Sequence, residues 1–206
     1  VHVEGLVHSS LEYVSFLALL GSLYVIAGGI HVSGDLEATP RTNLVILALG
    51  AVLANLIGTT GASMLLIRTI LRTNGQRKNV AHLPFFFILI VSNCGGLLTP
   101  MGDPPLFLGY LRGVPFTWTL QLWPFWLGAV GYLLTLFFFL DRRAYAREAA
   151  QDIARDAAEK IPLTIKGMIN LPLLLGVIGA IFLPTPWREA IMVGLAIVSV
   201  VVGPRP

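Results

Sequence analysis

One segment of this 206-residue sequence combines polar side chains with residues that interrupt helices. Residues 92–105 read Ser-Asn-Cys-Gly-Gly-Leu-Leu-Thr-Pro-Met-Gly-Asp-Pro-Pro, which includes three glycines and three prolines. This density of helix breakers predicts an unwound centre between two half-helices, with freed backbone carbonyls. Those carbonyls and the side-chain oxygens of Ser92, Asn93 and Thr99 are hard ligands suited to a sodium ion. The segment is therefore a candidate cation site.

Asp103 adds a carboxylate to this segment. It is the one acid that we expect inside an apolar stretch away from its ends, where an ionisable residue indicates function. It could bind sodium, carry a proton, or alternate between the two. An Asp directly before Pro104 also suits the N-cap of a half-helix, and the two roles are compatible.

A second interruption lies in the apolar stretch of residues 43–72. As one helix the stretch would be about 45 Å long, too long for a bilayer core of about 30 Å, and it would bury Arg68. A re-entrant helical hairpin over residues 43–73 resolves both problems, because both ends then lie at one membrane face. Its tip contributes the candidate ligands Asn55, Gly58, Thr59 and Thr60.

The composition places both interruptions in a membrane protein. Hydrophobic residues make up 55% of the chain and charged residues 12%, against about 25% charged in soluble domains. The net charge of +3 would suggest a nucleic-acid partner only if the basic residues formed a patch. The basic residues lie between apolar runs instead, so we expect no nucleic-acid partner. The single cysteine, Cys94, excludes an internal disulfide and a cysteine-based zinc site.

Five apolar stretches could each cross the membrane, which predicts an all-α polytopic protein with about five transmembrane helices plus the hairpin. The stretches are residues 11–32, 83–111, 120–140, 168–183 and 188–203. The second of them contains the breakers, so we expect that helix to be unwound at mid-membrane. Acids and bases alternate at helical spacing over residues 141–166, which predicts a charged cytoplasmic linker helix.

The stretches LANLIGTTGASMLLIR and SNCGGLLTPMGDPPLFLGY resemble the ion-transporter superfamily, which includes D-type sodium/proton antiporters, arsenite exporters, and sodium-coupled citrate and dicarboxylate transporters. Over residues 11–203 the chain looks closest to bacterial proteins labelled sodium/proton antiporter or citrate transporter. The resemblance implies two inverted repeats, each with a hairpin and an unwound helix that together bind sodium beside the substrate. It also implies a multi-pass protein of the bacterial inner (plasma) membrane, surrounded by membrane lipid, and leaves a homodimer open.

On this resemblance the chain is half of an inverted-repeat transporter. Residues 1–140 would form the first repeat, residues 141–166 the linker, and residues 167–206 the first spans of a truncated second repeat. A second hairpin and a second unwound helix are expected after Gly203. Matched by position, the residues of the hairpin tip are Asn55, Gly58, Thr59 and Thr60. Those of the unwound helix are Gly95, Gly96, Thr99, Gly102 and Pro104.

Two departures from the dicarboxylate carriers bear on the substrate. The tip reads Gly-Thr-Thr where those carriers usually show Ser-Asn-Thr, and Asp103 stands where they tend to have a small neutral residue. An acid would repel a carboxylate substrate, so the departures favour sodium/proton antiport by a protein that is not an enzyme. The alternative is a sodium-coupled citrate or dicarboxylate symporter.

A third interpretation is an intramembrane protease, because Met101-Gly102-Asp103 faintly resembles the environment of membrane aspartyl proteases. That chemistry needs a second intramembrane Asp, which this sequence lacks. It also lacks a His-Glu-x-x-His zinc motif and a Gly-x-Ser-x-Gly elbow.

Overall fold

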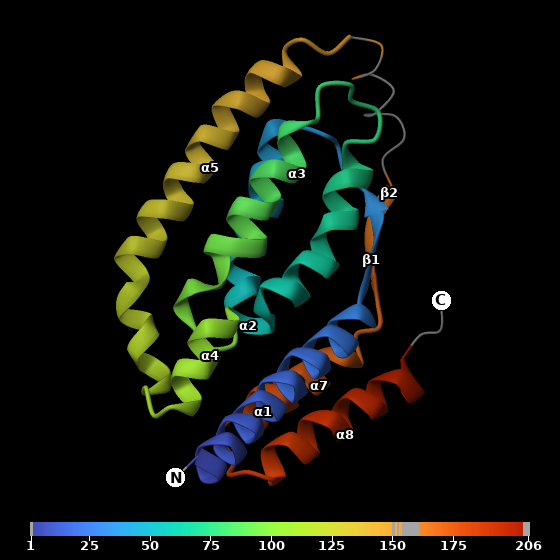
Figure 1. The fold of residues 1–206 in the computed structure, drawn as a ribbon. Helices are drawn as coiled ribbons and strands as arrows, with labels where there is room; N and C mark the ends of the chain where they lie inside the picture. The colour runs from blue at the N-terminus through green and yellow to red at the C-terminus, as the bar shows by residue number, and fades with distance from the viewer. Residues whose placement is uncertain (1, 150, 152, 154–160, 204–206) are drawn as a thin grey trace.

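The described part of the chain is mostly helical, with one pair of short strands (Figure 1). The computed structural model describes residues 2–149, 151, 153 and 161–203. The first half contains α1 His2–Gly28, β1 His31–Asp35, α2 Pro40–Thr73, α3 His82–Phe87, a π-helix Ile88–Asn93, a 3-10 helix Cys94–Leu98 and α4 Pro104–Leu111. The second half contains a 3-10 helix Phe116–Leu122, α5 Trp123–Tyr145, β2 Ile161–Lys166, α7 Asn170–Ala180 and α8 Trp187–Val202.

The segment α2 is a helical hairpin, because the chain reverses at Gly58. Gly58 has φ 77° and ψ 155°, a backbone conformation that is essentially restricted to glycine. Asn43, in the first turn of α2, and Asn74, directly after its last residue, exchange two side-chain hydrogen bonds of 2.9 and 2.7 Å. A straight helix would hold these residues about 46 Å apart. The two arms therefore lie side by side, and the reversal falls within the hairpin predicted over residues 43–73 (Figure 1).

Local sequence explains how the first arm begins and packs. Thr39 is the N-cap, its Oγ1 accepts a hydrogen bond from the Thr42 backbone N–H at 3.2 Å, and Pro40 follows in the first turn. Further along, a Cβ on Gly50 would lie 2.6 Å from Val91 and 3.1 Å from Leu66. The missing side chain therefore lets the first arm contact both the second arm and the π-helix.

The helical run that begins at His82 is interrupted between Leu98 and Pro104, inside the predicted break. It passes from α-helix to π-helix to 3-10 helix, and Thr99 and Asp103 are then extended. Proline cannot continue a helical hydrogen-bond ladder, which explains why the chain leaves the helix here. The unwinding of this helix is thus observed.

The helices fit the all-α prediction, and one pair of short strands is added to them. β1 and β2 pair antiparallel, with His31 opposite Lys166. β1 replaces the end of the helix expected over residues 11–32, because α1 ends at Gly28 and a second glycine follows. β2 occupies the end of the linker helix expected over residues 141–166, and α5 extends into the beginning of that range. The remaining part of that prediction, at residues 150, 152 and 154–160, lies outside the described residues.

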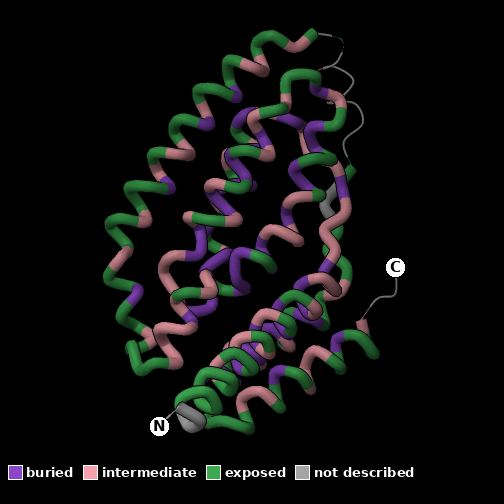
Figure 2. The backbone as a smooth tube through the Cα atoms, in the orientation of Figure 1, coloured by how far each residue is buried: buried purple, intermediate pink, exposed green. Residues whose placement is uncertain are grey.

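Burial separates an inner group of segments from outer ones. The buried residues gather in the hairpin and the broken helix, whereas only Val130, Phe137 and Asp141 of α5 are buried (Figure 2). α1, α7 and α8 pack against one another. By length and composition three segments within the described ranges could cross a membrane: Gly5–Gly28, Pro40–Thr73 and Phe116–Tyr145. Since the second of these folds back on itself, the number of spans stays a prediction.

Candidate ion-binding site at the hairpin tip

The hairpin tip and the broken helix meet through three hydrogen bonds. Leu98 N donates to Asn55 Oδ1 at 2.8 Å, and Thr99 Oγ1 donates to the Asn55 carbonyl at 2.5 Å. Thr59 N donates to the Gly102 carbonyl at 3.0 Å. The reversal and the break each leave backbone groups without helical hydrogen-bond partners. These bonds supply partners for such groups, and apolar surroundings require every backbone polar group to have one.

Three glycines permit this contact. A Cβ on Gly96 would lie 2.5 Å from the Gly102 carbonyl oxygen and 2.7 Å from Thr59 Cγ2, and a Cβ on Gly102 would collide with the Gly96 carbonyl oxygen. A Cβ on Gly58 would lie 3.1 Å from the Met101 carbonyl oxygen. Larger residues at these positions would separate the tip from the break.

α5 and the 3-10 helix before it hold the other side of the break. Trp126 Nε1 donates to the Gly95 carbonyl and Thr119 Oγ1 to the Leu98 carbonyl, each at 2.9 Å. Gly95 itself is enclosed, because a Cβ there would lie 3.0 Å from Ala51 Cα. The sequence patterns did not identify Trp126 or Thr119, since nothing in their spacing relates them to the break.

The predicted site residues divide into a central and a peripheral group. The structure brings together Asn55, Gly58, Thr59, Gly95, Gly96, Thr99 and Gly102. Ser92 instead pairs with Ser63 of the second arm, with 2.8 Å between their Oγ atoms. Thr60 and Asn93 are exposed.

Asp103 is half-buried at the N-cap position of α4, with Pro104 beginning the helix. Its carbonyl accepts hydrogen bonds from Leu106 N at 3.0 Å and Phe107 N at 3.3 Å, whereas its carboxylate makes no capping hydrogen bond. The backbone of Asp103 therefore caps α4, and its carboxylate is left for another partner.

The chemistry of the central group is that of neutral oxygens. No group of three or more His, Cys, Asp or Glu residues that could hold a metal occurs among residues 2–149, 151, 153 and 161–203. The carbonyls of Gly96 and Met101 lie at the contact. Thr59 is 8% exposed, and its hydroxyl makes none of the side-chain hydrogen bonds found in the described part of the chain. Such oxygens suit a hard cation of low charge.

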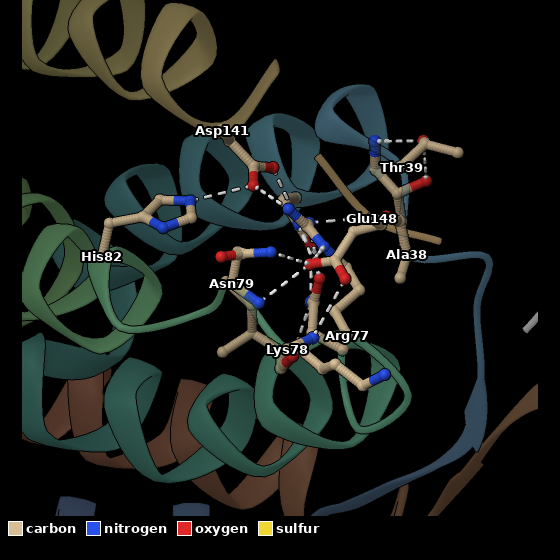
Figure 3. A network of polar contacts seen from close by, with 12 residues as sticks. Ala38, Thr39, Arg77, Lys78, Asn79, His82, Asp141 and Glu148 are labelled. Carbon is tan, nitrogen blue, oxygen red and sulfur yellow. Dashed lines mark hydrogen bonds and ion pairs between the residues drawn. The ribbon is translucent and has the colours of Figure 1, made fainter. Parts of the chain in front are cut away.

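A second polar network lies at the opposite end of the hairpin (Figure 3). Arg77 Nη2 lies 2.6 Å from Asp141 Oδ1, and His82 Nε2 lies 2.9 Å from the same oxygen. Asn43 Nδ2 donates to Asp141 Oδ2 at 3.0 Å. This network, which joins α5 to the base of the hairpin, was not predicted, because Arg77 follows the hairpin whereas Asp141 begins the segment predicted as the linker helix.

Glu148 binds the backbone of the loop between α2 and α3, beside this network. Its carboxylate accepts hydrogen bonds from the backbone N–H groups of Asn79 at 2.8 Å and Lys78 at 3.2 Å, and it lies 3.8 Å from Arg77 Nε. Burial acts to raise the pKa of Glu148, but these hydrogen bonds and the charge of Arg77 outweigh it. The pKa of Glu148 is therefore lowered from its ordinary value.

Comparison with known families gives one match. A family model described as "Putative citrate transport" matches residues 1–203, which include the hairpin and the broken helix. No curated protein and no solved structure matches. The match confirms the part of the sequence resemblance that concerned citrate transporters. The resemblance to sodium/proton antiporters stays a prediction.

Proposed function

This chain belongs to the putative citrate transport family, and we propose that it carries citrate or a similar small carboxylate across a membrane together with sodium. Its long apolar helices and its family support a membrane transporter. The finer assignment, sodium-coupled symport, rests on the contact between hairpin tip and break. The protein would lie in the bacterial inner membrane and cross it several times.

The observation that carries the proposal is the group of neutral oxygens where the two interruptions meet. Asn55 and Thr59 of the tip and Thr99 and Gly102 of the break are joined by hydrogen bonds. Paired breaks in membrane helices are a recurring place for coupling ions. A sodium ion there would be bound by carbonyls, with the Thr59 hydroxyl as a further ligand.

The lengths of the hairpin arms support a re-entrant position. The first arm, residues 40–57, is about 27 Å long, and the second, residues 59–73, about 22 Å. Neither spans a core of about 30 Å, and both start from the end at which Asn43 and Asn74 meet. The tip would then lie inside the membrane, where the broken helix covers its backbone.

Uptake of labelled citrate into proteoliposomes, with sodium or potassium gradients of equal size, tests this proposal. We expect uptake only with sodium. Thr59→Val keeps the side-chain shape and removes the hydroxyl, so it should raise the sodium concentration for half-maximal uptake about tenfold. Thr135→Val is the matched control, because Thr135 is exposed on α5. Uptake that is independent of sodium would contradict the proposal.

Sodium/proton antiport is the second candidate, and the half-buried carboxylate of Asp103, which caps nothing, favours it. Asp103→Asn should abolish sodium-driven proton movement in vesicles if that carboxylate carries the proton. Under citrate symport the same variant should retain sodium-driven citrate uptake. Unchanged proton exchange in Asp103→Asn would eliminate the role of Asp103.

A further inference from the structure

A cavity of about 660 Å³ lies between the end of α1, β1 and the second arm of the hairpin. Its volume is within the range of about 300–1,000 Å³ that is common for small-molecule sites. Arg68, Arg72 and His31 line it, and none of its lining residues is Asp or Glu. The cavity is therefore cationic.

The two arginines have no charged partner in the described part of the chain. Neither Arg68 nor Arg72 takes part in an ion pair or a side-chain hydrogen bond there. By contrast, Arg77, Arg112 and Arg188 each contact a carboxylate. Arg68 and Arg72 are four residues apart in one helix, so their guanidinium groups lie on the same face and repel each other. An anion between them would remove this repulsion.

The strand β1 forms one wall of the cavity. It places His31 in the lining, and His31 is paired across the sheet with Lys166. Asp35 belongs to the same strand but does not line the cavity. Charge from the sheet therefore does not neutralise the arginines.

We propose that this cavity binds a small polycarboxylate, with Arg68 and Arg72 each available for paired hydrogen bonds to a carboxylate group. The site is distinct from the contact at the hairpin tip. Arg68 lies about 14 Å along the same arm from Thr59, so the anion would bind on the arm whose end takes part in the ion site. The choice of a polycarboxylate rests on the proposed function.

The test measures citrate binding to the purified protein in detergent by calorimetry, together with citrate uptake in proteoliposomes. Arg68→Gln/Arg72→Gln should weaken citrate binding at least tenfold and raise the KM for uptake. Arg68→Lys/Arg72→Lys should lose part of this affinity, because lysine cannot form the paired hydrogen bonds. Arg41→Gln is the matched control, since Arg41 is an exposed arginine of α2 outside the cavity. All variants should unfold at the wild-type temperature.

The outcomes separate this inference from the proposed function. Sodium-driven citrate uptake with unchanged binding in the double Gln variant would overturn the cavity site alone. Arginine-dependent citrate binding without citrate uptake would support the site and contradict the proposed symport. A third experiment adds phosphatidylglycerol, whose headgroup is also an anion. Arginine-dependent lipid binding without citrate binding would overturn the polycarboxylate assignment.

Discussion

Arg77 and Asp141 form a 2.6 Å ion pair whose side chains are 3% and 0% exposed, although 64 residues separate them along the chain. Asn43 and His82 complete the contacts of the Asp141 carboxylate. The guanidinium of Arg77 also lies over the ring of Tyr145, with 5.3 Å to its centroid. The base of the hairpin, the loop after it and the end of α5 are therefore held by one buried charge pair.

Asp141→Asn should destabilise the protein by about 3–5 kcal/mol, because it leaves the charge of Arg77 buried without its partner. Chemical unfolding of the purified protein in detergent measures the loss. The control is Arg112→Gln, which breaks an ion pair with Glu12 whose arginine side chain is 68% exposed, and should cost about 0–1 kcal/mol. Equal losses in the two variants would show that burial does not govern the strength of these pairs.

Gly58→Ala should destabilise the hairpin by about 1–3 kcal/mol, because alanine rarely adopts φ 77°. The added methyl group would also lie 3.1 Å from the Met101 carbonyl oxygen. Thermal unfolding and citrate uptake check both effects. Gly128→Ala is the control, since Gly128 is helical and has nothing within 4 Å of the added Cβ. If the Gly58→Ala protein had wild-type stability, the reversal at residue 58 would not require glycine.

Trp126→Phe should cost about 1–3 kcal/mol, because the Gly95 carbonyl would lose its 2.9 Å donor in a buried position. We also expect weaker sodium binding, since the break would be held less firmly against α5. Unfolding and sodium-dependent uptake measure the two effects. Trp123→Phe is the control on the same helix, because Trp123 is 59% exposed. A change in sodium affinity that is equal in both variants would oppose this role of Trp126.

The contacts of Glu148 should make the stability of the loop between α2 and α3, residues 74–81, depend on pH. The pKa of Glu148 is lowered in the folded protein, so its contacts stabilise the fold above the unfolded value of about 4.3. This contribution is lost as the pH falls through the lowered pKa. Glu148→Gln should therefore unfold at a lower temperature than wild type at pH 7, and the difference should shrink below about pH 4. A difference that is constant from pH 7 to pH 3 would refute this dependence.

The hairpin and the break could be predicted because each violates the rules for a membrane helix. Residues 43–72 are too long for one span and contain Arg68, and the break concentrates glycine and proline within a few residues. Both features are local, so a single sequence reveals them. Two interruptions that are energetically costly in a membrane are expected to lie at the same membrane depth. This expectation predicts the contact of Asn55 and Thr59 with the break.

The remaining features depend on contacts between distant residues. The pairing of His31 with Lys166 joins segments 135 positions apart, and β1 contains Gly34, which weakens any strand pattern. Similarly, Trp126 reads as one aromatic residue among several in α5 until the fold brings it to Gly95. The sequence shows the residue types but not these partners.

The reciprocal amide bonds between Asn43 and Asn74 have an electrical consequence. Both amide groups are uncharged. A membrane potential acts on net charge, at about 2.3 kcal/mol per elementary charge for each 100 mV. The Asn43–Asn74 contact therefore adds no charge on which the potential could act, whereas Arg68 and Arg72, which have no charged partner among the described residues, each carry one.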